Sequence, residues 1–64
     1  MKQQTLETIR NNIMENLGLT IDYADFESCR DLEKKLIREN ADEQTCIMAF
    51  TEYFQNLLID LEKK

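Results

Sequence analysis

Apolar residues recur at the period of an α-helix along the first part of the chain. They lie three or four positions apart and fall within an arc of about 80° at 100° per residue: Leu6, Ile9, Ile13 and Leu17, with Met14 on the flank. Gly18 follows directly and suits the left-handed position just after a helix. The pattern predicts a helix over residues 4–17.

A second helix is expected over residues 28–38. Ser28 has Asp31 three residues on, an acidic variant of the spacing found in capping boxes. From that start one apolar stripe forms, made of Cys29, Leu32 and Leu36, with Ile37 beside it. A helix that began near Tyr23 would instead place Asp25 and Glu33 within its apolar arc. We therefore expect a loop or short turn before residue 28 that holds three side chains against the core: Ile21, Tyr23 and Phe26.

A third helix over residues 42–61 has the widest apolar face in the chain. Asn40 together with Glu43, or Asp42 alone, can cap its first turn. Its apolar residues fill an arc of about 140°: Cys46, Ile47, Phe50, Tyr53, Phe54, Leu57, Leu58 and Leu61. One neighbouring helix cannot cover so wide an arc, so we expect this helix to pack against both others.

Composition agrees with an all-α fold. The 64 residues include no Pro, Trp, His or Val and a single Gly, which leaves few strand or turn signals. We expect one helical domain over residues 1–64, built as a small three-helix bundle. A chain this short buries only about 60% of its unfolded surface, so self-association through the third helix, as a dimer, is the expected source of further stability.

Cysteine usage and the first residues indicate a reduced, cytoplasmic setting. Cys29 and Cys46 stand alone, with no paired Cys-x-x-Cys motif and no His that would complete a metal site. No apolar run like that of a signal peptide follows Met1, and no stretch approaches the length that spans a bilayer. We expect both thiols to be buried as small hydrophobic groups.

Two apolar residues of the third helix lie outside its core arc. Met48 and Ile59 project within about 20° of each other on the opposite side, with Glu52 and Gln55 bordering them. A single exposed apolar residue needs no explanation, but two aligned ones suggest a second contact. The four residues are the candidate partner-binding surface, for a dimer or another protein, and incidental exposure is the alternative.

Charge is unevenly distributed. The chain has 13 acidic and 8 basic residues, and none of the basic ones lies between Glu39 and Glu62. Arg30, Lys34 and Arg38 recur every four residues and form a possible charged contact stripe. The alternative is a solvated face on which neighbouring carboxylates of the same helix neutralise these bases. Because the third helix has no base to meet a phosphate, direct binding to nucleic acid is disfavoured.

Groups that carry catalysis are absent from the sequence. It has no glycine-rich phosphate loop, no nucleophile–histidine pair and no calcium loop. Asp22 and Asp25 lie close together, but in a segment rich in capping residues they are better explained as helix caps. We expect neither enzymatic activity nor a cofactor.

Residues 6–33 resemble, in layout, the small two-helix aspartyl-phosphate phosphatases of sporulating bacteria. The similarity comprises an amphipathic first helix, a short loop and a Ser-led segment that begins the second helix, Ser28-Cys29-Arg30-Asp31-Leu32-Glu33. Leu32 stands where that family has Asp, and Glu33 follows one place late, rotated by about 100°. The activity of those phosphatases is therefore not carried over.

These features favour a small protein-interaction module. It would act as an inhibitor, adaptor or accessory protein, of a kind that phages and other mobile elements encode, by occupying a surface and without catalysis. The alternative is an acidic decoy that imitates nucleic-acid phosphates and inhibits a nuclease or other DNA-binding enzyme. Its support is the group of acidic residues near and within the third helix: Asp42, Glu43, Glu52 and Asp60.

Overall fold

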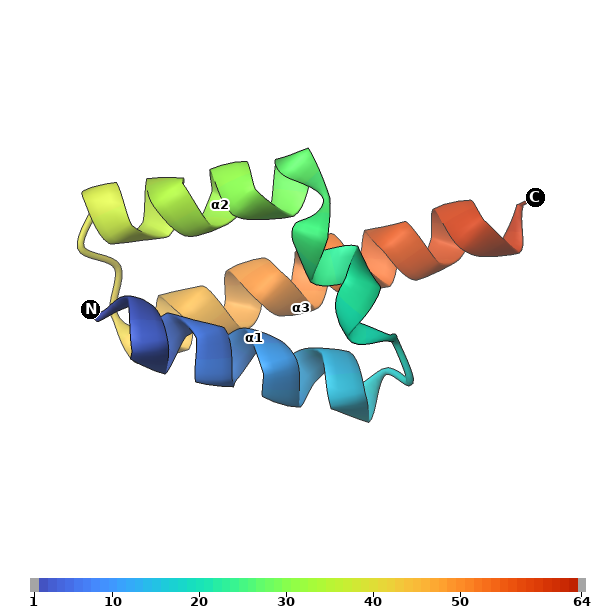
Figure 1. Cartoon of the computed structure of the whole chain (residues 1–64), viewed down its shortest axis with the longest axis horizontal. Coiled ribbons are helices and arrows are strands. Elements are labelled where there is room, and N and C mark those ends of the chain that lie inside the picture. Colours follow the sequence, from blue (N-terminus) through green and yellow to red (C-terminus); the bar gives the residue numbers. More distant parts are fainter. Residues whose placement is uncertain (1, 64) are drawn as a thin grey trace.

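The computed structural model describes residues 2–63 and contains three α-helices and one short 3₁₀ helix (Figure 1). The elements are α1 (Gln3–Asn16), η1 (Ile21–Asp25), α2 (Glu27–Arg38) and α3 (Glu43–Glu62). The predicted all-α three-helix bundle is confirmed, and each α-helix begins and ends within one residue of its predicted bounds.

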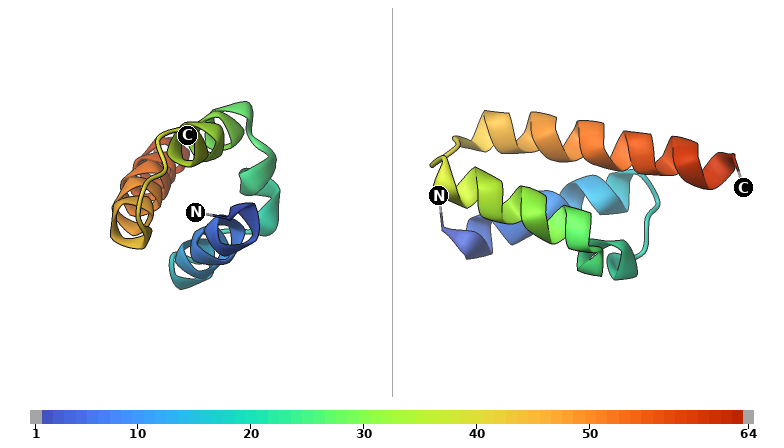
Figure 2. Two further views of the ribbon diagram at one scale, coloured as in Figure 1. Left: turned by 90° about the vertical axis from the view of Figure 1, so that its left-hand side faces the viewer. Right: turned by 90° about the horizontal axis from the view of Figure 1, so that it is seen from above.

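The three helices run along one long axis. α1 and α3 point in the same general direction, and α2 returns antiparallel to both, with η1 joining α1 to α2 at one end (Figures 1 and 2). α3 is the longest, with 20 residues against 14 and 12. Its last turns extend beyond the ends of the other two helices (Figure 2). The last turns of α3 therefore lack the neighbours that its earlier turns have.

Side chains from all four elements meet in one hydrophobic core. Its buried members are Leu6, Ile9 and Met14 of α1, Ala24 of η1, Cys29 and Leu36 of α2, and Cys46, Phe50 and Phe54 of α3. The rings of Phe50 and Phe54 lie nearly parallel, 6.1 Å apart between centroids. Tyr53 packs edge-on against Phe54 at 5.0 Å. α3 thus supplies both buried aromatic rings and lies at the centre of the core.

The buried faces differ from the predicted arcs at their edges. On α1, Met14 is buried although its predicted place was the flank, whereas Ile13 and Leu17 are half-buried. On α3, Ile47 is 42% exposed and does not belong to the core, contrary to prediction. Leu57 packs against the core from a half-buried position. The side of each helix that faces the core was predicted correctly. The extent to which neighbouring elements cover that side was not predicted.

Both short connections leave their helix through a left-handed residue. Gly18 has φ +74°, and the amides of Gly18 and Leu19 donate to the carbonyls of Glu15 and Met14, as predicted for a helix C-terminus. Asn40 has φ +52° and ends α2 in the same way, with its amide donating to the Ile37 carbonyl. Its predicted capping pair with Glu43 is therefore wrong: Asn40 ends a helix, and it tolerates this conformation better than most residues do.

Asp42 caps the N-terminus of α3, as predicted. Its Oδ1 accepts a hydrogen bond of 2.8 Å from the backbone N–H of Thr45. Hydrogen bonding of the carboxylate to Thr45, to its side chain first and to its backbone N–H second, lowers the pKa of Asp42.

The segment before α2 is the turn that was expected, with a different residue in the core. Ala24 is buried and Tyr23 half-buried, whereas Phe26 is 43% exposed, contrary to prediction. The rings of Tyr23 and Phe26 meet edge-on at 5.4 Å. The side chain of Ile21, also predicted to face the core, lies outside the described part of the structure.

Ser28 does not cap α2, which begins one residue earlier and without a side-chain cap. Its hydroxyl instead shares a hydrogen bond of 2.5 Å with the phenol of Tyr53 on α3. The predicted packing of α3 against both other helices is confirmed by this bond and by the shared core.

Replacing Phe50 by Ala is expected to lower the free energy of unfolding by about 3–5 kcal/mol, because its fully buried ring would leave a cavity at the centre of the core. Leu57→Ala removes a half-buried side chain and should cost less, about 1–2 kcal/mol. Urea unfolding followed by circular dichroism measures both. Equal losses would contradict the assignment of the core to the middle of α3.

Candidate functional site

The side of α3 that faces away from the core carries the four residues predicted to meet a partner. We call them the outer stripe: Met48, Glu52, Gln55 and Ile59. All four are exposed, Met48 by 66% and Ile59 by 50%. At 100° per residue the centre of this stripe lies about 150° from the buried phenylalanines. None of the four side chains makes a hydrogen bond or ion pair with another residue in the described range 2–63.

Ile47 extends the apolar surface at one end of the outer stripe. Together with Met48 it lines a shallow hollow, bordered by Glu43 and Gln44. A second hollow continues from Ile47 toward Ile13 of α1. Sequence reasoning missed this extension because it assigned Ile47 to the core. The exposed apolar surface therefore lies mostly near the first turns of α3, with Ile59 more than two turns further on.

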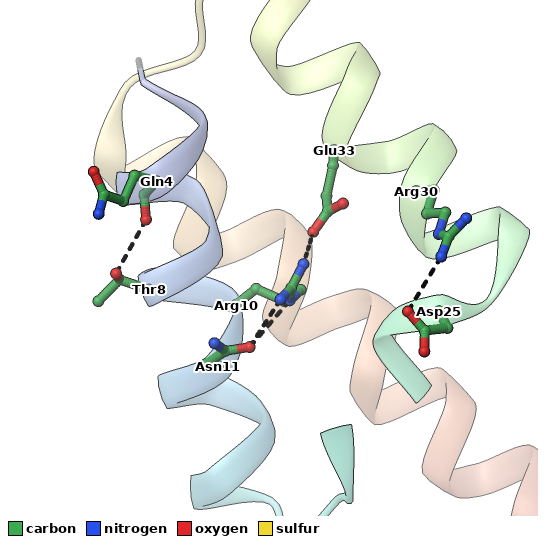
Figure 3. Close-up of polar contacts among 7 residues, drawn as sticks. All are labelled: Gln4, Thr8, Arg10, Asn11, Asp25, Arg30 and Glu33. Carbon is green, nitrogen blue, oxygen red and sulfur yellow. Dashed lines mark hydrogen bonds and ion pairs between the residues drawn. The ribbon is translucent and has the colours of Figure 1, made fainter. Parts of the chain in front are cut away.

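The predicted charged stripe on α2 is exposed, but its charges are balanced differently than expected. Arg30 pairs with Asp25 of η1 at 3.2 Å in an exposed contact, and Asp25 therefore does not act as a helix cap (Figure 3). Lys34 and Arg38 have no ion-pair partner among residues 2–63. The carboxylates of α2 that were expected to neutralise this face form no ion pair with its bases. Glu27 and Asp31 are exposed close to this stripe at 100° per residue, so the face carries charges of both signs.

An ion pair that sequence reasoning missed connects α1 to α2. The guanidinium of Arg10 donates through Nη1 to the Glu33 carboxylate, and its Nε and Nη2 donate to Oδ1 of Asn11 (Figure 3). Only 12% of the Arg10 side chain and 14% of the Glu33 side chain are exposed. A signal was present in the sequence, since around the first helix Arg10 falls between Leu17 at the edge of the apolar arc and Met14 on its flank. A base in that position indicates a half-buried partner of opposite charge.

This ion pair lies in a cleft of about 480 Å³ between α1 and α2. Its charged lining is balanced, with three acids and three bases: Glu7, Asp25 and Glu33, and Arg10, Arg30 and Lys34. Two of the acids are already paired with two of the bases. The cleft therefore shows no preference for an anionic or a cationic ligand.

Cys29 and Cys46 are fully buried in the core, as expected, and are not joined in a disulfide. Burial, and to a smaller extent the nearby Glu33 carboxylate, raises the pKa of the Cys29 thiol to about 11. Burial likewise raises the pKa of Cys46. Among residues 2–63, no three His, Cys, Asp or Glu side chains are grouped so that they could hold a metal ion.

Comparison of the chain with models of known protein families, with curated proteins and with solved structures finds no match. The likeness of residues 6–33 to aspartyl-phosphate phosphatases gains no support from these comparisons, and Glu33 is held by Arg10. Within the described residues, no helix has the length and apolar character needed to cross a membrane.

A double-mutant cycle on Arg10→Met and Glu33→Gln is expected to show a coupling energy of about 1–3 kcal/mol. Each single change leaves the partner's half-buried charge unpaired, whereas the double change removes both charges. Urea unfolding of the four proteins gives the coupling. Strictly additive effects would contradict a direct interaction between the two side chains.

Both native thiols are expected to react slowly with a disulfide reagent at pH 8, because a pKa of about 11 leaves only about one Cys29 thiol in a thousand ionised. Absorbance of the released thiolate, with and without denaturant, measures the rates. A Gln55→Cys variant supplies an exposed reference thiol. A native thiol that reacted as fast as this reference would contradict the burial described above.

Proposed function

We propose that this chain is a small protein-interaction module that binds through the outer stripe of α3 and does so without catalysis. The observation that carries the proposal is the exposure of Met48 and Ile59 on the side of α3 opposite the core. Two aligned, exposed apolar side chains on one stable helix fit the mode in which helices dock on one another. The surface is small, so binding through it is weak or is supplemented by neighbouring contacts.

The charged stripe on α2, made of Arg30, Lys34 and Arg38, is the second surface that such a module would use. Lys34 and Arg38 are unpaired there and attract an acidic partner. Contacts of this kind change the rate of association and its salt dependence more than they change affinity. We therefore place the binding energy on α3 and assign α2 a steering role.

The alternative, an acidic decoy of nucleic acid, has weaker support. At 100° per residue, Glu52 projects about 180° from Glu43, and Asp60 projects about 80° from Glu52. Acids that point in three directions form no row with the regular spacing of phosphates. Binding that weakened steeply with salt would favour the decoy, whereas apolar docking changes little.

The proposal is tested by affinity capture from a lysate of the native host, followed by mass spectrometry. The baits are the wild-type chain, the double variant Met48→Glu/Ile59→Glu and the control Lys34→Gln/Arg38→Gln, whose changes lie on α2. We expect a protein that wild type and control retain and that the α3 double variant loses. Circular dichroism must show that all three baits keep their helicity, since none of the changed residues is buried.

Capture of the same proteins by all three baits would overturn the assignment to α3. If only the α2 variant failed to capture a protein, the binding site would instead be assigned to the charged stripe on α2. No enrichment by any bait would contradict the interaction module itself, as far as heterologous partners are concerned.

A further inference from the structure

The exposed apolar side chains of α3 form a band that is wider than the outer stripe and begins beside α1. It consists of two pairs of neighbouring residues, Ile47 with Met48 and Leu58 with Ile59. Ile47 is 42% exposed, and Leu58 is half-buried without packing against the core. At 100° per residue the four span about 120° of the helix surface. We call them the apolar band.

Both ends of the apolar band are accessible to another helix. At the first pair, one hollow runs from Ile47 toward Ile13 of α1, and a second is lined by Ile47 and Met48. These hollows are places where apolar side chains of a partner can insert. The second pair lies on the last turns of α3, which extend beyond the other helices (Figure 2). A partner can therefore contact the band along its whole length.

The two margins of the apolar band are acidic. At 100° per residue, Glu43 lies about 40° beyond Ile47 on one margin, and Glu52 lies about 20° beyond Ile59 on the other. Both carboxylates are exposed. Among the described residues that line the two hollows, Glu43 is the charged one. α3 itself has four acidic residues and no base, and Lys63 comes only after its last residue.

From the apolar band and its acidic margins we propose that this side of α3 binds an amphipathic helix of another protein whose apolar face is flanked by Lys or Arg. The inference rests on the proposed function and names the chemistry of its partner. Apolar side chains of the partner helix pack on the band, as in other helix-in-groove contacts. Its flanking bases meet Glu43 and Glu52. The two apolar pairs are about 16.5 Å apart along α3, so the partner helix needs at least about three turns.

Charge decides between the possible occupants of this side. A second copy of a chain with net charge −5 would bring acidic margins against acidic margins. Nucleic acid and anionic membrane surfaces carry the same sign as Glu43 and Glu52 and are repelled. A helix with acidic flanks would place like charges together, which costs affinity. A helix with basic flanks gains from both margins.

The charged stripe on α2 is a separate surface. Tyr53, which shares a hydrogen bond with Ser28 of α2, projects about 180° from the centre of the apolar band. The band and α2 therefore lie on opposite sides of α3. Acidic groups attracted by α2 would belong to a different part of the partner from the basic helix.

Two designed peptides test the proposal by fluorescence anisotropy with the purified chain, at about 0.15 M salt. Both are helices of about 18 residues with the same Leu face, and they differ only at the flanking positions, which are Lys in one and Glu in the other. We expect the Lys peptide to bind in the micromolar range and at least about tenfold more tightly than the Glu peptide.

The acidic margins are tested with Glu43→Gln/Glu52→Gln, which should weaken binding of the Lys peptide about fivefold or more. The control, Glu27→Gln/Asp31→Asn, removes the same number of exposed carboxylates from α2, and Glu27 matches Glu43 as an acid in the first turn of its helix. Because salt screens exposed charges beyond about 8 Å, the control should change binding less than about twofold.

The apolar contact is tested with Ile47→Gln and Ile59→Gln, each of which should weaken the Lys peptide at least about fivefold. Ile37→Gln is the matched control, because Ile37 is an isoleucine of α2 with 38% exposure that lies outside the band. It should leave binding unchanged. Circular dichroism must show the same helicity for every variant.

Four results would overturn the inference. They are no binding of the Lys peptide up to about 1 mM, equal binding of the two peptides, equal weakening by the α2 and α3 acid variants, and no response to Ile47→Gln. The last would indicate a contact made by charge alone.

Capture from lysate separates this inference from the proposed function. A host protein that is captured through α3 and is retained in full by Glu43→Gln/Glu52→Gln would overturn the basic helix and leave the interaction module. A Lys peptide that binds as expected, while no bait captures a host protein, would support the chemistry of the surface and contradict the module.

Discussion

The burial of one side of α3 between α1 and α2 is the constraint on which the rest of this structure depends. Phe50 and Phe54 are fully buried there, together with Cys46. α1 and α2 meet each other mainly across the open cleft that Arg10 and Glu33 bridge. Neither helix has enough apolar surface for a core without α3, because isolated short helices are marginal in water and gain their stability from packing.

The same constraint explains why an exposed apolar surface is left for the proposed binding. A helix whose core lies on one side leaves the opposite side to solvent unless another element covers it. Two neighbouring helices cannot surround α3, and its last turns extend beyond both of them (Figure 1). Met48 and Ile59 remain exposed for this reason, and their substitution leaves the core untouched. Stability and binding can therefore be changed independently in this chain.

The buried thiols and the left-handed helix ends belong to the fold. Cys29 of α2 and Cys46 of α3 are fully buried members of the shared core, where they act as small hydrophobic side chains. Gly18 and Asn40 reverse the chain within a few residues, which keeps both connections short. Because both connections are short, few residues of this small domain lie outside the packed helices.

Much of the fold followed from hydrophobic periodicity, because a 3.6-residue period fixes which side of each helix is apolar. Periodicity shows on which side of a helix a side chain lies, but it does not show whether a neighbouring helix covers that side chain. For that reason Ile47 and Phe26 were placed in the core although both are exposed. The bridge from Arg10 to Glu33 was missed because charged residues within an apolar arc were treated as breaks in the pattern. On the candidate site, the exposure of Met48 and Ile59 was predicted correctly, while their role stays a prediction.

Native-state hydrogen exchange measured by NMR tests the central place of α3 most directly. Amides in the middle of α3, from Cys46 to Phe54, should exchange only through global unfolding and be the slowest in the chain. Those of α2, held by fewer buried side chains, should exchange faster through local opening. If the middle of α3 exchanged faster than α1 or α2, the core would not depend on α3 and this account would be wrong.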